Sequence, residues 1–150
     1  MRLEDEIKQI RPFTNEFLKL FVNIAFTSSW LNTVLANGLK SYGLTPQQFN
    51  VLKILKGHFP ESHNNQAITK RMLDRSSNAT RIVDKLISKK LAARVEDKSD
   101  RRSVKISITK AGLELLKEIE KEDFYTKDLI RNLDEKKAKQ MNAWLDEIRG

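Results

Sequence analysis

The sequence predicts a mainly α-helical protein with a small antiparallel β-hairpin. Over most of the chain the apolar residues recur at spacings of three and four, as one face of an amphipathic helix requires. One short stretch, residues 104–108, alternates in steps of two, as a half-buried strand does. The 150 residues suffice for one substantial hydrophobic core, so we expect a single domain.

Two helices are predicted in the first 60 residues. From Thr14 to about Leu39 the apolar positions follow one face of a long helix. Thr45 is a potential N-cap and Pro46 a first-turn residue for a second helix, which Gly57 and Pro60 end.

A short third helix and a longer fourth helix follow. Residues 61–65 have the composition of an exposed loop, and the third helix then covers 67–73. A polar turn, residues 74–77, separates it from a fourth helix that runs from Asn78 to about Leu91, with Ser77 as its expected N-cap. One side of the fourth helix is apolar and another is polar and mostly basic. Two helices joined by a turn, the second with a polar outer face, are typical of a helix that enters the major groove of DNA.

A β-hairpin is predicted after the fourth helix. The alternating stretch Val104–Ile108 can pair with Ala93–Glu96 as the two arms. Residues 97–103 between them are polar, with three basic residues among them. Because such a tip has nothing to bury, we expect it to contact a partner outside the protein.

The C-terminal part is predicted to be helical. Residues 113–133 form one long amphipathic segment, and Asp134 is a potential N-cap for a last helix. Together with the first helix, these elements carry more apolar surface than a small DNA-binding part needs, which favours packing against a second copy as a homodimer. Packing within one chain is the alternative. The expected dimer interface consists of Phe13, Phe17, Leu129, Leu133, Met141, Trp144, Leu145 and Ile148.

The positive charge is concentrated in one block. The net charge is +8, and residues 66–110 hold 13 basic and 5 acidic residues, whereas the rest of the chain is balanced. This concentration favours a face that binds a polyanion. A solvated basic surface is the alternative interpretation.

Several classes of function are excluded or disfavoured by composition. The absence of cysteine excludes disulfides, thiolate metal sites and thiol redox sensing. His58 and His63 lack a third ligand at metal spacing, so we expect neither a metal nor a cofactor. No convergent set of titratable groups indicates an enzyme. No apolar run approaches the roughly 20 residues of a membrane span, and the charged start is unlike a signal peptide, so we expect a cytoplasmic protein with no membrane partner.

Three motifs resemble those of the MarR family of bacterial transcriptional regulators. They are Leu44-Thr45-Pro46-Gln47-Gln48-Phe49, Thr80-Arg81-Ile82-Val83-Asp84-Lys85-Leu86, and Asp100-Arg101-Arg102 through Ile108-Thr109-Lys110-Ala111-Gly112. The resemblance extends from about Thr14 to the C-terminus. It implies a single winged helix-turn-helix regulator domain over residues 1–150, with a DNA-binding part at about 44–110 and dimerisation helices at about 1–42 and 111–150.

The resemblance implies a sequence-specific regulator that acts as a homodimer on a palindromic operator in double-stranded DNA, and we expect a repressor rather than an activator. The recognition helix would lie in the major groove. Arg81 could read guanine and Asn78 adenine, each worth about 1–3 kcal/mol of discrimination. The contacts expected from this helix are Ser77, Asn78, Thr80, Arg81 and Lys85.

The resemblance also assigns roles to the hairpin tip, which would be the wing. In the family's Asp-x-Arg motif the arginine enters the minor groove and the aspartate holds it, which here implicates Arg102 and Asp100. Lys98 and Arg101 complete the expected wing contacts. An ordinary turn residue is the alternative for Asp100.

The family commonly binds small aromatic or phenolic acids in a cleft between the dimer helices and the DNA-binding part. Four residues could line such a cleft here: Phe26, Trp30, Phe49 and Leu52. Aromatic residues at helical spacing are also typical of a core, and that alternative stays open.

Two positions depart from the family pattern. Lys90 precedes Leu91 where many members have glycine, so a left-handed helix end would cost about 1 kcal/mol or be avoided. Asp74 stands where the turn is usually apolar, and Leu73 could supply the missing anchor.

A rival function is a winged-helix module that binds protein, or nucleic acid without reading its sequence. Salt dependence and sequence dependence of binding distinguish the two readings, because only a regulator should strongly prefer one palindrome.

Overall fold

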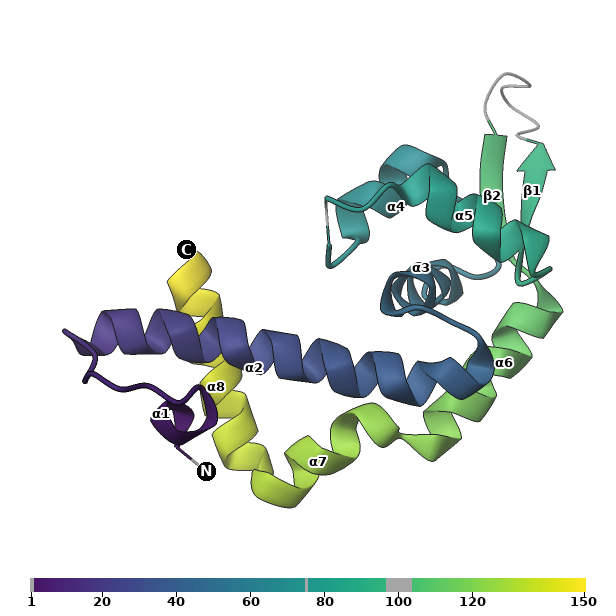
Figure 1. Ribbon diagram of the computed structural model, residues 1–150. Coiled ribbons are helices and arrows are strands. Elements are labelled where there is room, and N and C mark those ends of the chain that lie inside the picture. The colour runs from purple at the N-terminus through teal and green to yellow at the C-terminus, as the bar shows by residue number, and fades with distance from the viewer. Residues whose placement is uncertain (1, 75, 97–103) are drawn as a thin grey trace.

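The computed structural model describes residues 2–74, 76–96 and 104–150, with the backbone alone at residues 96 and 128–130. It is mainly helical with one two-stranded antiparallel sheet, as predicted (Figure 1). The elements are α1 Leu3–Glu6, α2 Glu16–Leu39, η1 Lys40–Tyr42, α3 Pro46–Lys56, α4 Asn65–Arg71, α5 Ala79–Ser88, β1 Ala92–Glu96, β2 Val104–Ile108, α6 Lys110–Glu122, α7 Phe124–Asn132 and α8 Glu135–Arg149.

Side-chain caps fix several helix starts. The Thr45 hydroxyl accepts the backbone N–H of Gln48, and the Gln48 side chain accepts that of Thr45, which forms a capping box. Asp134 accepts the N–H of Lys137 at 2.8 Å and caps α8. Both caps were predicted. The cap of α5 was predicted wrongly, because Asn78 and not Ser77 holds that position.

The segment 113–133, expected to be continuous, is two helices. Asp123 has a left-handed backbone, with φ of 45°, and separates α6 from α7. Its carboxylate accepts a hydrogen bond from the hydroxyl of Thr126 at 2.6 Å, which stabilises the start of α7. The helical spacing of apolar residues continues across the break, so the sequence pattern does not reveal it.

The hairpin is confirmed, and it has an additional edge. β1 and β2 pair antiparallel, with Ala92 opposite Ile108. The His63 N–H donates to the Ile106 oxygen at 2.9 Å, and the Ile106 N–H donates to the His63 oxygen at 2.7 Å. The segment predicted as an exposed loop therefore anchors β2 at its far edge.

The hydrophobic core lies at one end of the molecule. We call residues 44–122, which hold α3 to α6 and the hairpin, the head, and we call α2, α7 and α8 the arms. α2 extends away from the head, and α8 crosses α2 near the N-terminal end of α2 (Figure 1). No helix within the described residues is long and apolar enough to cross a membrane. The most deeply buried core side chains are Leu39, Val51, Leu52, Leu55, Ile68, Leu86, Ile106, Leu116 and Ile119.

Candidate nucleic-acid interface

Helix α5 presents the polar side that the sequence predicted. Ala79, Val83 and Leu86 are buried in the core. This anchoring fixes the helix on the head and leaves the opposite side uncovered. The predicted contact residues on that side are Asn78, Thr80, Arg81 and Lys85, all exposed, with Ser77 half-buried beside them.

Arg81 and Lys85 lie one turn apart on this exposed side. Neither side chain makes a hydrogen bond or an ion pair with another residue that the structure describes. A guanidinium offers a planar fork of donors, and an ammonium offers a compact positive charge. Both groups are therefore available to an external acceptor such as a base edge or a phosphate.

The other three predicted contacts are engaged within the chain. The Asn78 Oδ1 accepts the N–H of Arg81 at 3.1 Å. The Thr80 hydroxyl accepts a hydrogen bond from Asn65 Nδ2 at 3.4 Å, and the Ser77 hydroxyl donates to Asp74 Oδ2 at 2.6 Å. These contacts hold the start of α5, so an adenine contact by Asn78 would share an oxygen that already caps the helix.

Asp74 organises the turn before α5. Its Oδ1 accepts hydrogen bonds from the backbone N–H of Ser76 at 3.0 Å and from the Ser76 hydroxyl at 2.6 Å. These bonds, with that from Ser77, lower the pKa of Asp74. The prediction that Leu73 replaces Asp74 as an apolar anchor is wrong, because Leu73 is 88% exposed and Met72 is buried instead.

The end of α5 turns through a left-handed lysine. Lys90 has φ of 60°, and the Leu91 N–H donates to the Leu86 oxygen at 3.0 Å, which closes the helix end. The Thr109 hydroxyl donates to the Lys90 oxygen at 2.8 Å. Because Thr109 also caps α6, this contact ties the end of α5 to the start of α6.

An ion pair that the sequence did not reveal connects α5 to the hairpin. Arg94 of β1 lies 2.7 Å from Asp84 of α5, and both side chains are about half exposed. Such a pair adds little stability, so its main effect is on orientation. A helix residue paired with a strand residue ten positions later follows no local pattern, which is why only the structure identifies it.

The predicted wing contacts lie outside the described residues. These are Lys98, Asp100, Arg101 and Arg102. Their roles stay predictions.

The four predicted effector-cleft residues do not meet at one surface. Phe49 and Leu52 are buried in the core of the head. Phe26 and Trp30 line an open hollow of 570 Å³ beside α1. A second, mainly apolar groove of 1590 Å³ runs between α2 and α8 and reaches Leu73 in the turn before α5.

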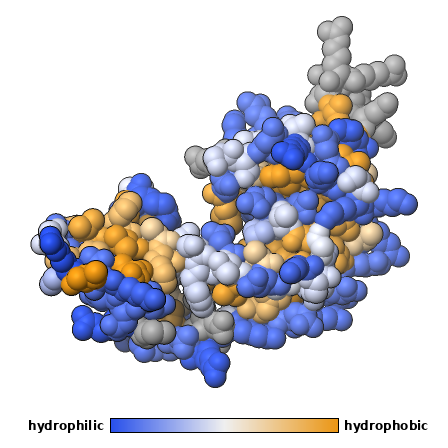
Figure 2. All heavy atoms as spheres, in the orientation of Figure 1, coloured by the Kyte–Doolittle hydropathy of each residue, from blue (hydrophilic) through white to orange (hydrophobic). Residues whose placement is uncertain are grey.

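The predicted dimer residues lie mainly on the exposed surface of the arms. Phe17 is 85% exposed, and Trp144 and Ile148 are each 57% exposed. Figure 2 shows hydrophobic residues gathered over α8 and the adjoining part of α2. Of the remaining predicted residues Met141 is exposed, whereas Phe13, Leu133 and Leu145 are half-buried, and the side chain of Leu129 lies outside the described part.

The sequence has recognisable relatives. The MarR family model matches residues 44–104, which include α3 to α5 and β1. Over 108 residues the chain is 34% identical to the HTH-type transcriptional regulator MhqR of Bacillus subtilis, an alignment that covers 71% of this chain and 72% of that protein.

Solved structures share the fold. The transcriptional repressor CouR, bound to a 23-mer DNA duplex, superimposes with a TM-score of 0.79 at 22% identity, over 93% of this chain and 99% of that one. The MepR–DNA complex of S. aureus gives a TM-score of 0.75 at 23% identity, over 91% and 97%. With the sequence match to MhqR, these findings show that the chain belongs to the MarR family of transcriptional regulators.

Proposed function

We propose that this regulator binds double-stranded DNA sequence-specifically, with α5 in the major groove and residues 97–103 as the wing. The observation that carries the proposal is the exposed side of α5. Arg81 and Lys85 there have no partner among the described residues, while the opposite side of the helix is held in the core. A rigid helix with unpaired donors suits direct reading of base edges.

The distribution of charge supports the same proposal. The excess of basic residues lies within 66–110, the block that contains α5 and the hairpin. Contacts with phosphates would supply affinity and orientation, and Arg81 would supply sequence preference. CouR and MepR, which share this fold, were solved with DNA bound.

The proposed active species is a homodimer, with a DNA-binding part at about 44–110 and dimerisation helices at about 1–42 and 111–150. Phe17, Trp144 and Ile148 are exposed apolar residues on α2 and α8, where a second copy would cover them. A two-fold dimer would present two copies of α5 to a palindromic operator.

We further propose repression, by occupation of the operator, and release by a small aromatic effector. The hollow lined by Phe26 and Trp30 is the site that would take the aromatic ring, with Lys19 at its wall. Release would require that the effector bind better to a dimer whose two heads no longer match the operator.

Selection of bound duplexes from a random pool, at near-physiological salt, tests the proposal. The parent chain should select a palindrome, Arg81→Ala should change the preferred bases, and Arg102→Ala should weaken binding. Lys139→Ala removes an exposed positive charge on α8 and serves as the matched control, with an unchanged motif. No motif for the parent, together with binding that merely fades as salt rises, would favour the non-specific module.

A further inference from the structure

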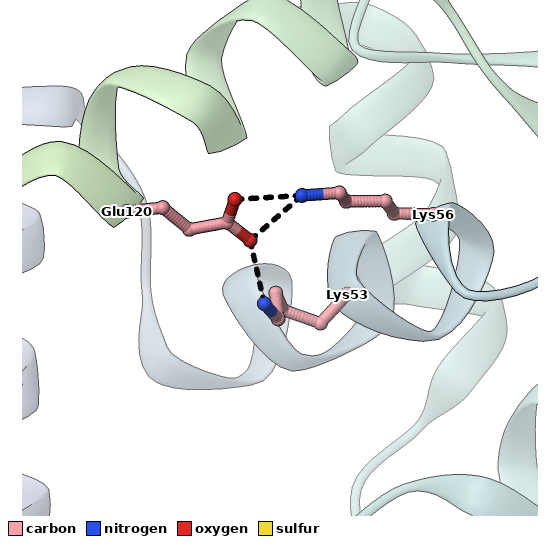
Figure 3. Close-up of polar contacts among 3 residues, drawn as sticks. All are labelled: Lys53, Lys56 and Glu120. Atoms are coloured by element: carbon pink, nitrogen blue, oxygen red, sulfur yellow. Dashed lines mark hydrogen bonds and ion pairs between the residues drawn. The ribbon is translucent and has the colours of Figure 1, made fainter.

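One carboxylate ties the last turn of α6 to α3, at the place where the chain leaves the head for the arms. Glu120 of α6 lies 2.6 Å from Lys53 Nζ through Oε1, and 2.8 and 2.7 Å from Lys56 Nζ through its two oxygens (Figure 3). The two lysines are neighbours on one side of α3. Their hydrogen bonds and positive charges lower the pKa of Glu120, so the carboxylate stays ionised at neutral pH.

This cluster is located where the chain leaves the head. Glu120 lies in the last turn of α6, three residues before the left-handed Asp123 that starts the path into α7. Directly beyond the break, the Phe124 ring packs over Gly38 of α2. The Tyr125 ring lies 5.8 Å from that of Phe49 in α3.

The cluster differs from an ordinary surface pair. The three side chains are only 28–41% exposed, and the carboxylate separates two ammonium groups that would otherwise repel each other. A carboxylate that pairs with two lysine ammonium groups is held in place from two sides. Isolated exposed ion pairs, in contrast, often contribute nothing measurable to stability. Leu116 and Ile119, both fully buried, already attach α6 to the core, so Glu120 is not needed to keep α6 folded.

We propose that Glu120 is a positioning residue. By holding the last turn of α6 on α3 it sets the direction in which α7 leaves the head, and thereby the distance between the two α5 helices of the dimer. This inference rests on the proposed function. A two-fold dimer must place its recognition helices about 34 Å apart to reach successive major grooves. Since α3 lies between α5 and α2 (Figure 1), a small rotation of the head relative to α2 would displace α5 along the DNA.

Operator spacing gives the readout. The selected palindrome is altered by adding or removing one and two base pairs at its centre, and the affinity of each duplex is compared with that of the original. The parent should lose affinity at altered spacings. Glu120→Gln keeps the shape but removes the charge, and it should reduce that discrimination by about threefold or more, the size expected for the loss of a small ion-pair network.

Two further variants separate positioning from charge and from stability. Glu118→Gln makes the same charge change at an exposed position on α6 and should keep the parent's spacing profile. Lys53→Gln combined with Lys56→Gln removes the cluster without leaving two lysines uncompensated, and it should relax the profile as Glu120→Gln does. Each result is the ratio of the affinities of one variant for two duplexes. A reduced folded fraction or a changed non-specific affinity alters both affinities equally and therefore cancels from the ratio.

The outcomes are distinguishable. A Glu120→Gln profile equal to that of the parent would overturn the inference and leave the proposed function intact. A parent chain that binds every spacing equally well would also overturn the inference, whereas a parent chain that selects no palindrome at all would refute the proposed function.

Discussion

The head and the arms differ in how deeply their apolar side chains are buried. In the head, side chains from α3, α5, β2 and α6 close one core, in which Leu52, Leu86 and Leu116 are fully buried. On the arms, Phe17, Phe21 and Trp144 stay more than half exposed. The head can therefore fold on contacts within one chain, whereas the arms lack a covering surface.

This difference in burial fits two separate roles, DNA binding for the head and association with a second copy for the arms. If α5 reads DNA as proposed, it must keep a fixed position on the head, and burial of Ala79, Val83 and Leu86 on its inner side provides that within one chain. Apolar surface on the arms has a cost in water, which favours association with a second copy.

Leu86→Ala should lower the free energy of unfolding by about 3 kcal/mol, because it opens a cavity in a fully buried position. The loss should be the same at low and high protein concentration in urea unfolding, because the head needs no partner. A loss that disappears at high concentration would contradict a self-contained head.

Gly38→Ala should destabilise the protein by about 1–3 kcal/mol, more than the helix propensity that alanine adds. A Cβ at this position would lie 2.1 Å from a ring carbon of Phe124, so α7 would have to move away from α2. Asn37→Ala, at an exposed position of the same helix, is the control for urea unfolding. A more stable Gly38→Ala variant would show that α7 does not pack as described.

Trp144→Ala should weaken dimerisation by about tenfold or more, because large aromatic side chains dominate most interfaces. Sedimentation over a range of concentrations measures the effect, and Lys139→Ala on the same helix should leave the dimer unchanged. Equal dissociation constants for Trp144→Ala and the parent would remove α8 from the interface.

Lys90→Gly should stabilise the head by about 1 kcal/mol, because glycine adopts the left-handed backbone at this helix end without strain. Ser88→Gly, two residues earlier and within α5, should instead lose about 1 kcal/mol. Thermal unfolding of the two variants should therefore shift in opposite directions, and a shift of the same sign would refute the account of this helix end.

Titration of His63 should make a small part of the folding stability depend on pH. Burial, followed by the charges of His58 and Arg71, lowers the pKa of His63 below its ordinary value of 6.5. The unfolded chain therefore takes up this proton first, so the contribution of His63 to stability is present above pH 6.5 and is lost as the pH falls toward the folded-state value. Urea unfolding at pH 7.5 and 5.5 should show a smaller loss for His63→Asn than for the parent; equal losses would count against this role.

Local signals made much of the fold predictable. Thr45 and Asp134 cap helices through contacts three residues away, and the alternation over 104–108 identifies a strand directly. The polar side of α5 could be located for the same reason, since Arg81 and Lys85 follow from helical spacing alone.

The features that were missed depend on contacts distant in sequence. The Asp84–Arg94 pair, the attachment of His63 to Ile106 and the ion cluster of Glu120 each join separate elements. The break at Asp123 interrupts a pattern that is continuous in sequence. The effector cleft was expected from the family resemblance, and residue type alone cannot distinguish the core positions of Phe49 and Leu52 from an exposed one.

The central claim is that two rigid heads joined by their arms read one DNA site together. The most direct test is the mass and affinity of the complex on the selected palindrome and on a duplex that keeps one half-site. We expect two chains on the palindrome and much weaker binding to the half-site duplex. One chain per duplex, with equal affinity for both, would contradict it.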